Sequence, residues 1–280
     1  NPNIKIEPVV AAYNDYHPKL FVMIAGGMAP DVFRVNSSFY FHDFLRIKAL
    51  RDITNLIKRD KIDMSLYYSP GPEECSFKGR YYGLPWGTAP SYIGINLKVF
   101  REAGIPVPSY DWTWDDFAKL CREFKKRDII GYADNLEMEW LLPFVWGTGI
   151  DLFDKTLTQF TLNHPAAAAR IQELANLIKE GAIADPSVVL ASQDIRTRWL
   201  ATDKAAMCAA NCNDVLTLQN LGVEFAVMTY PGGPVVKNTS MYKSNLVGIS
   251  TQTRNVEAAW KFLKFLRSPN GVGERLYCQA

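Results

Sequence analysis

The side chains that could do chemistry in this sequence are mainly aromatic rings, amides and hydroxyls at expected turns and strand ends. Trp86, Thr88 and Tyr92 lie in a glycine- and proline-rich stretch at positions 78–96, and a second polar run occupies positions 36–38. Flat rings cover the carbon skeleton of a ligand, while amides and hydroxyls fix its orientation. This combination is typical of a site that holds a neutral polar molecule.

No arrangement typical of catalysis or metal binding is present in the sequence. The histidines, His17, His42 and His164, are far apart and lack partners at metal-ligand spacing. The chain has no HExxH, GxSxG, phosphate-loop or kinase signature, and no carboxylate pair stands in an apolar setting. Five scattered cysteines form neither a disulfide framework nor a zinc site. We therefore predict no catalytic residue, no metal and no cofactor.

The composition is that of a soluble globular protein with enough apolar residues for a large core. Of the 280 residues, 48% are hydrophobic and 21% are charged, and this length suits one large or two ordinary domains. The net charge is +2, and no basic block indicates a nucleic-acid partner. No apolar run reaches the length of a membrane span. Because the chain starts at Asn1 without Met or a signal peptide, we expect it to be processed or trimmed.

Strand and helix patterns alternate along the chain, which predicts an α/β protein. The first unit is a strand at 4–10, a helix at 13–24 and a strand at 31–35. Such a unit favours a parallel strand pair, with ligands bound beyond the carboxyl ends of the strands. The polar run at 36–38 would lie there, although a plain polar loop explains it equally well.

Local signals predict further helices and one irregular strand. Thr113 can cap a helix with Asp116 in a capping-box position, and Pro165 marks the start of another helix. The stretch 78–96 is extended but interrupted, because its two prolines cannot donate to a sheet ladder. It therefore suits a crossing between two bodies, and the alternative is an ordinary buried strand after a turn.

Six motifs resemble those of family 1 extracellular solute-binding proteins, the sugar-binding subunits of ABC importers of the maltose-binding-protein type. They follow the family's order over essentially the whole chain. In this sequence they are KL…IAGGMAPDV at 19–32, YGLP at 82–85, INLKVFREAGIP at 95–106, WTWDDF at 112–117, DKAAM at 203–207 and LVGIS…AAWKF at 246–262. Each motif alone is weak, and the six in order carry the resemblance.

The resemblance implies a periplasmic-binding-protein-like fold of type II, in which hinge strands join two α/β lobes with a ligand cleft between them. Residues 1–88 and 245–280 would form a discontinuous first lobe, and residues 89–244 the second. The family has further elements before the part matching Asn1 and beyond the part matching Ala280, so we expect an incompletely covered chain. In the family, a tryptophan that stacks on the sugar commonly follows the "AAM" motif, whereas Asn-Cys-Asn stands at 211–213 here.

The residue pattern and the resemblance together give ten candidate ligand-binding residues. Each group has a structural alternative: a polar loop at 36–38, hinge packing at 86–92 and turn formation at 211–213. Trp140 or Trp146 would replace the missing stacking ring or belong to the core, and Asn245 flanks the second crossing. Trp114, Trp199 and Trp260 lie on apolar helix faces and are predicted core residues. The candidates are Asn36, Ser37, Ser38, Trp86, Thr88, Tyr92, Trp146, Asn211, Asn213 and Tyr242.

The sequence therefore predicts a monomeric, non-enzymatic receptor for a carbohydrate, either a sugar or an oligosaccharide. It would bind by hinge closure and deliver its ligand to the permease subunits of an ABC transporter. We expect it at the extracellular face of the membrane, held by a lipid-modified cysteine ahead of Asn1, or in the periplasm. Two alternatives stay open. One is a glycan-processing enzyme on the same scaffold, which a buried carboxylate pair facing the cleft would favour. The other is a sensor that signals to a membrane kinase.

Overall fold

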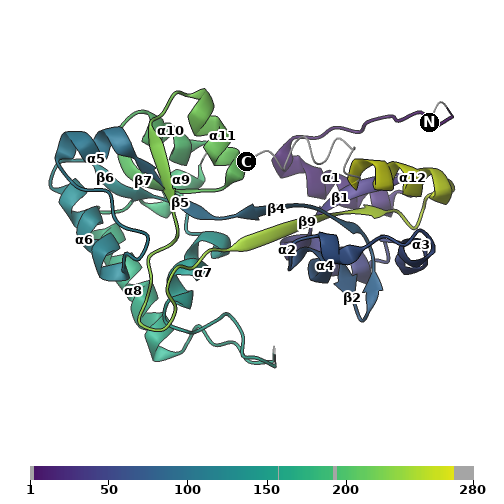
Figure 1. Cartoon of the computed structure of the whole chain (residues 1–280), viewed down its shortest axis with the longest axis horizontal. Helices are drawn as coiled ribbons and strands as arrows, with labels where there is room; N and C mark the ends of the chain where they lie inside the picture. Colours follow the sequence, from purple (N-terminus) through teal and green to yellow (C-terminus); the bar gives the residue numbers. More distant parts are fainter. Residues whose placement is uncertain (1–2, 157, 192–193, 268–280) are drawn as a thin grey trace. The chain divides into compact units, whose positions relative to one another are not determined.

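The protein forms two compact α/β units (Figure 1). The computed structural model describes residues 3–156, 158–191 and 194–267. The described part of unit 1 falls within Asn1–Ala89 and Lys243–Ala280, and unit 2 is Pro90–Tyr242.

The chain passes from one unit to the other through two strands, β4 (Leu84–Pro90) and β9 (Tyr242–Ile249). β4 belongs to the interrupted stretch at 78–96, and the first division falls just before its last residue, Pro90. The expected lobe boundaries, after residues 88 and 244, lie beside the two divisions and stay predictions.

Unit 1 is built on a three-stranded sheet in the order β1–β9–β4. Strand β1 (Val32–Asn36) runs antiparallel to β9, with Asn36 opposite Asn245. Two apolar clusters fill the unit: one joins α1, α2 and β1, and the other packs Trp260 of α12 against β4 and β9. The remaining elements are α1 (Tyr13–Ala25), α2 (Ser37–Arg46), α3 (Thr54–Arg59), the 3-10 helix η1 (Met64–Leu66), α4 (Gly71–Glu74), β2 (Ser76–Phe77), β3 (Arg80–Tyr81) and α12 (Val256–Arg267).

The predicted strand at 4–10 is wrong, and so is the parallel pair that it would have formed with the strand at 31–35. Residues 4–10 have no regular structure and are mostly exposed, and β1 instead pairs antiparallel with β9. An alternating segment forms a stable strand only where a neighbouring strand pairs with its edge and a core covers its apolar face. The partner of β1 lies more than 200 residues away in the sequence, with Val32 opposite Ile249. No local pattern indicates such a distant partner.

Unit 2 is built on a four-stranded sheet in the order β6–β7–β5–β8. The pair β6 and β7 is parallel, and β5 runs antiparallel to both β7 and β8. All six residues of β7 are buried, as expected for a central strand covered on both faces. The elements are β5 (Tyr92–Asn96), α5 (Leu97–Ala103), α6 (Trp114–Lys125), β6 (Ile130–Ala133), α7 (Met138–Trp146), α8 (Pro165–Lys179), α9 (Pro186–Leu190), α10 (Ile195–Ala201), β7 (Ala205–Ala210), α11 (Cys212–Asn220) and β8 (Phe225–Met228).

Helices cover both faces of this sheet (Figure 1). One cluster contains buried side chains from α5, α6, α7 and α8, and a second contains buried side chains from α9, α10 and α11. Trp114 and Trp199 lie in these clusters, and Trp260 is buried in unit 1, so the core prediction for all three is confirmed. The capping box of Thr113 and Asp116 also forms as predicted. Among the described residues, no helix is long and apolar enough to cross a membrane.

Candidate ligand-binding site

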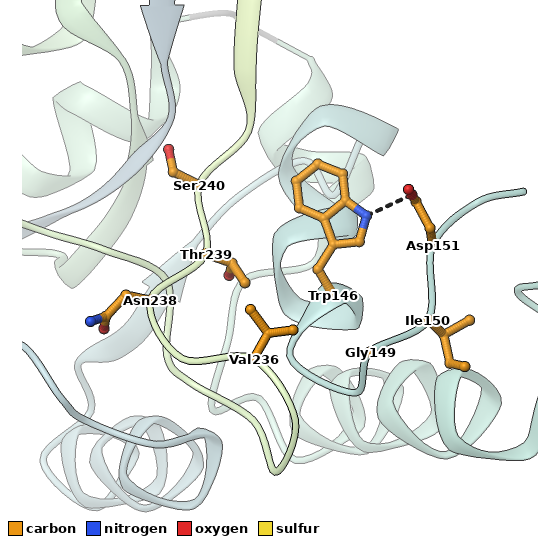
Figure 2. A pocket seen from close by; sticks show the side chains of 8 residues that line it. All are labelled: Trp146, Gly149, Ile150, Asp151, Val236, Asn238, Thr239 and Ser240. Carbon is orange, nitrogen blue, oxygen red and sulfur yellow. Dashed lines mark hydrogen bonds between the residues drawn. The ribbon is translucent and has the colours of Figure 1, made fainter. Parts of the chain in front are cut away.

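A pocket of about 440 Å³ opens in unit 2 at the end of α7 (Figure 2). One wall is the end of α7 and the segment after it, and the other is the segment that leads into β9. Its lining combines one indole, a carboxylate, an amide and two hydroxyls with two aliphatic side chains, which suits a ligand with apolar faces and polar edges. The lining residues are Trp146, Gly149, Ile150, Asp151, Val236, Asn238, Thr239 and Ser240.

Trp146 is the predicted residue that lies in this pocket, and its indole is held at one edge. Its Nε1 donates to Asp151 Oδ1 at 2.8 Å (Figure 2). The backbone N–H of Leu152 donates to the same oxygen at 2.7 Å. The ring is half-buried, so part of its surface stays accessible. By contrast, Trp140 is only 2% exposed. Of the two candidate stacking rings, only Trp146 is placed to cover a ligand.

Two glycines fix the distance between the pocket walls. The backbone N–H groups of Val235 and Val236 donate to Gly147 O at 3.1 and 3.2 Å. A Cβ atom on Gly233 would lie 2.2 Å from Gly147 O. No other residue fits at this contact, because real Cβ atoms do not approach so closely. The glycine pair therefore brings the segment at 236–240 against the end of α7.

The sequence did not indicate Asn238, Thr239 and Ser240 as site residues. Thr239 is buried and donates to Pro143 O at 2.7 Å, and the Ser240 hydroxyl donates to Ser91 O at 2.6 Å. Asn238 is exposed with a φ of 48°. The one signal in the sequence was three adjacent polar residues between a glycine-proline turn and a strand, a pattern shared by most surface loops.

A second polar group lies at the start of α11, beyond the carboxyl end of β7. Asn211 caps this helix: its Oδ1 accepts from Asn213 N at 2.8 Å, and its own N–H donates to Asp214 Oδ2 at 2.9 Å. The Asn213 side chain is exposed. Tyr92 at the start of β5 lies close by, and burial together with the negative charge of Asp214 raises its pKa. Asn211 therefore serves the helix cap, and Asn213 is the better placed of the two to meet a ligand.

Beneath that helix start, three ionisable side chains form a buried network. Arg196 Nη2 lies 3.6 Å from Asp214 Oδ2, and Arg196 Nη1 lies 3.9 Å from Asp134 Oδ1. Burial raises the pKa of Asp134 to about 7, against the opposing charge of Arg196, and burial also raises the pKa of Asp214. Asp134 is only 2% exposed. These two carboxyl groups therefore form a buried network with Arg196 inside the unit.

In unit 1, the predicted residues Asn36 and Ser37 lie at the junction of β1 and α2. Both are 7% exposed, and Asn36 Oδ1 and Ser37 Oγ have no hydrogen-bond partner within the described part of the chain. The same holds for Asn245 Oδ1, across the β1–β9 pair. The Asn36 N–H donates to His17 Nε2 at 3.2 Å, and burial lowers the pKa of His17 to about 4, which keeps that nitrogen an acceptor. Unsatisfied buried acceptors at a helix start favour a ligand that donates hydrogen bonds.

The other predicted residues are less informative about a ligand. Trp86 is half-buried beside the α12 cluster, and its carbonyl oxygen accepts from Arg267 Nη1 at 2.7 Å. Tyr242 is half-buried at the start of β9. The side chains of Ser38 and Thr88 lie outside what the structure describes. Within the described ranges, no group of histidine, cysteine, aspartate and glutamate side chains could hold a metal ion.

The predicted residues thus fall into three places: the Trp146 pocket, the start of α11 with Tyr92, and the β1–α2 junction of unit 1. A family model described as "Bacterial extracellular solute-binding protein" matches residues 1–272. An uncharacterized lipoprotein of Streptomyces antibioticus is 26% identical over 136 residues, which are 48% of this chain and 29% of that protein. The chain spans half or less of the curated relatives it matches.

Solved structures share the fold over nearly the whole chain. An ABC substrate-binding protein from Listeria monocytogenes, solved in complex with cycloalternan, has a TM-score of 0.87 and 25% identity, over 96% of this chain and 69% of that one. UgpB from Mycobacterium tuberculosis, solved with glycerophosphocholine, has a TM-score of 0.82 and 20% identity, over 96% and 69%. The predicted type II periplasmic-binding-protein fold is therefore confirmed.

Proposed function

Because this chain belongs to the family of bacterial extracellular solute-binding proteins, we propose that it is the carbohydrate receptor of an ABC importer. It would bind a sugar or an oligosaccharide and deliver it unchanged to the permease subunits. Its place would be the extracellular face of the membrane or the periplasm. The family and the solved structures of this fold are binding proteins rather than enzymes.

The observation that carries this proposal is the Trp146 pocket in unit 2. Sugar rings have apolar faces and hydroxyl edges, so a ring that is accessible beside hydroxyls, an amide and a carboxylate matches both. The unsatisfied oxygens of Asn36, Ser37 and Asn245 in unit 1 add acceptors for sugar hydroxyls. The structure solved with cycloalternan supports the same class of ligand. Hinge closure is a further part of the proposal, carried by the resemblance to the family.

A thermal-shift screen with purified ligands tests the ligand class. The panel contains maltose, maltotetraose, cycloalternan and glycerophosphocholine, with amino acids as a negative set. A ligand at a hundred times its dissociation constant adds about 2.7 kcal/mol to the free energy of unfolding, which a melting curve resolves. A shift with a sugar, and recovery of that sugar unchanged by mass spectrometry, supports a receptor. A shift with glycerophosphocholine alone would overturn the carbohydrate assignment, and conversion of the sugar would indicate an enzyme.

A pair of variants then tests the pocket itself. Trp146→Ala removes the accessible ring, and we expect it to weaken sugar binding at least tenfold, which is about 1.4 kcal/mol. The matched control is Tyr110→Ala, which removes an exposed aromatic ring of the same unit outside the pocket. Isothermal titration calorimetry measures the sugar affinity of both variants at equal folded fraction. Equal affinities in the two variants would show that the pocket does not contact the sugar.

A further inference from the structure

Arg196 is a buried arginine that contacts three different segments of unit 2. It comes from α10 and is 9% exposed. Its guanidinium lies 4.4 Å from the ring centroid of Trp140, on α7, in a cation–π contact. Its two terminal nitrogens face Asp134, directly after β6, and Asp214, in the first turn of α11.

The two aspartates follow the carboxyl ends of the parallel strands: Asp134 comes directly after β6, and Asp214 lies in the first turn of the helix after β7. In α/β sheets this edge is where ligand-contacting loops gather. Asp214 is also half of the capping box that sets the direction of α11, because its Oδ2 accepts the Asn211 N–H. Asp134 in turn stands at the start of the turn that leads into α7, and its Oδ2 accepts from the Tyr132 hydroxyl of β6 at 3.1 Å. A single guanidinium thus connects the turn after β6 with the helix start after β7.

We propose that Arg196 is a positioning residue for the ligand-binding edge of unit 2. This inference rests on the proposed function, since it assumes that the start of α11 meets the ligand. Burying an arginine between two carboxylates is a poor route to stability, because desolvation offsets most of the Coulomb attraction. The benefit of the arrangement lies in geometry. Planar guanidinium groups hold two carboxylates and a ring at fixed angles, which an aliphatic side chain of equal volume does not.

One pair of facing atoms in this network is too far apart for a hydrogen bond. Asp134 Oδ1 and Arg196 Nη1 are both buried, lie 3.9 Å apart, and have no hydrogen-bond partner among the residues that the structure describes. A movement of about 1 Å would bring them to the separation of a charge-assisted hydrogen bond. Arg196 is therefore able to pull the two segments together when a ligand orders the edge.

The chain offers a matched control in Arg170 on α8. Its side chain is 11% exposed, the same as that of Arg196, and its guanidinium lies 4.1 Å from the ring centroid of Trp114. Its ion-pair partner, Glu173, is on its own helix, so Arg170 connects no strand-end segments through charge. Arg196→Met and Arg170→Met remove equivalent charges and equivalent ring contacts, and only the first breaks the connection between the two segments.

Hydrogen exchange of the ligand-free protein gives the first readout. We expect Arg196→Met to speed exchange of the Asn211 and Asn213 amides at least tenfold, while the amides of β7 keep the wild-type rate. Arg196→Lys keeps the charge and is expected to restore part of the protection. Arg170→Met should leave the Asn211 and Asn213 amides unchanged. A general increase across the sheet, or no increase at Asn211 and Asn213, would overturn the inference. If the Met variant fails to fold, the Lys variant is judged by the same two amides.

Titration with cycloalternan as the probe gives the second readout. We expect Arg196→Lys to lower affinity at least fivefold at a melting temperature within two degrees of wild type, and Arg170→Met to leave affinity unchanged. Unchanged affinity in Arg196→Lys, with a wild type that binds, would overturn the positioning role. Should the wild type bind neither cycloalternan nor the other sugars, the carbohydrate function fails instead, and the exchange data alone decide whether Arg196 positions the edge.

Discussion

Replacing Asp134 with asparagine should remove a pH dependence that burial builds into unit 2. Asp134 is 2% exposed, and its pKa is raised from 3.8 to about 7. The folded protein therefore holds a proton on this carboxyl up to about pH 7, whereas the unfolded chain releases it near pH 4. Since the folded state binds more protons between those values, the free energy of unfolding falls as pH rises through this window.

The size of this effect follows from the shift in pKa. About three units at 1.36 kcal/mol each give a total of about 4 kcal/mol. Part of this loss in the free energy of unfolding has already occurred at pH 5, because the carboxyl of the unfolded chain is mostly ionised there. About 2 to 3 kcal/mol remains to develop between pH 5 and pH 8. The difference in unfolding free energy, Asp134→Asn minus wild type, should therefore rise by about that amount across this range.

Urea unfolding at pH 5, 6, 7 and 8 measures this difference directly, with far-UV circular dichroism as the probe. Asp185→Asn is the control in the same unit. Its carboxylate accepts from Ser187 and its pKa is lowered, so it is ionised in both states throughout the range and adds no slope. A constant difference between Asp134→Asn and wild type would refute the reasoning, and so would a difference that falls with pH. A constant difference would mean that the charge of Arg196 balances or outweighs the cost of burial, so that the Asp134 carboxyl is ionised in both states across this range.

Two further predictions concern packing and the first crossing. Gly131→Ala would place a Cβ 2.4 Å from Cys121 Cα, so we expect a loss of about 3 kcal/mol in urea unfolding. Gly94→Ala in the same sheet, where the Cβ contacts begin at 3.5 Å, should cost less than about 1 kcal/mol, and equal costs would contradict the packing argument. Trp86→Ala should weaken sugar binding more than Trp260→Ala in titrations matched for folded fraction, although loss of the fully buried Trp260 should cost about 3–5 kcal/mol of stability. Equal, small effects on binding would assign Trp86 to hinge packing.

The residues that the sequence predicted well are those whose role is local. A capping box needs only two suitable residues three positions apart, so the sequence alone was enough to predict the one formed by Thr113 and Asp116. Asn36 and Asn211 show the limit of such patterns. Both precede a helix. The side-chain oxygen of Asn211 accepts hydrogen bonds from the first turn of that helix, while Asn36 Oδ1 is buried without a hydrogen-bond partner among the described residues. The same residue type in the same local setting therefore has two roles, which tertiary packing decides.

Pocket residues were harder to predict because distant segments form the pocket. Trp146 was a candidate because it is a large ring, but the wall at 236–240 reaches it through the close approach of Gly147 and Gly233. Those glycines are almost 90 positions apart, and each alone resembles an ordinary turn glycine. The pairing of β1 with β9 was missed for the same reason, since hydrophobic patterning specifies a face and not a partner.

The double passage of the chain through β4 and β9 sets an order for folding during synthesis. Every strand of the unit 2 sheet lies between Tyr92 and Met228, so that sheet is complete before β9 leaves the ribosome. Unit 1 must wait, because β9 is the central strand between β1 and β4. Among the strands that the structure describes, β1 is made first, so it waits longest for its partner β9, with an unpaired edge next to the apolar residues of α1 and α2. A chaperone that binds nascent chains would find its target at this edge, which is exposed until β9 has been made.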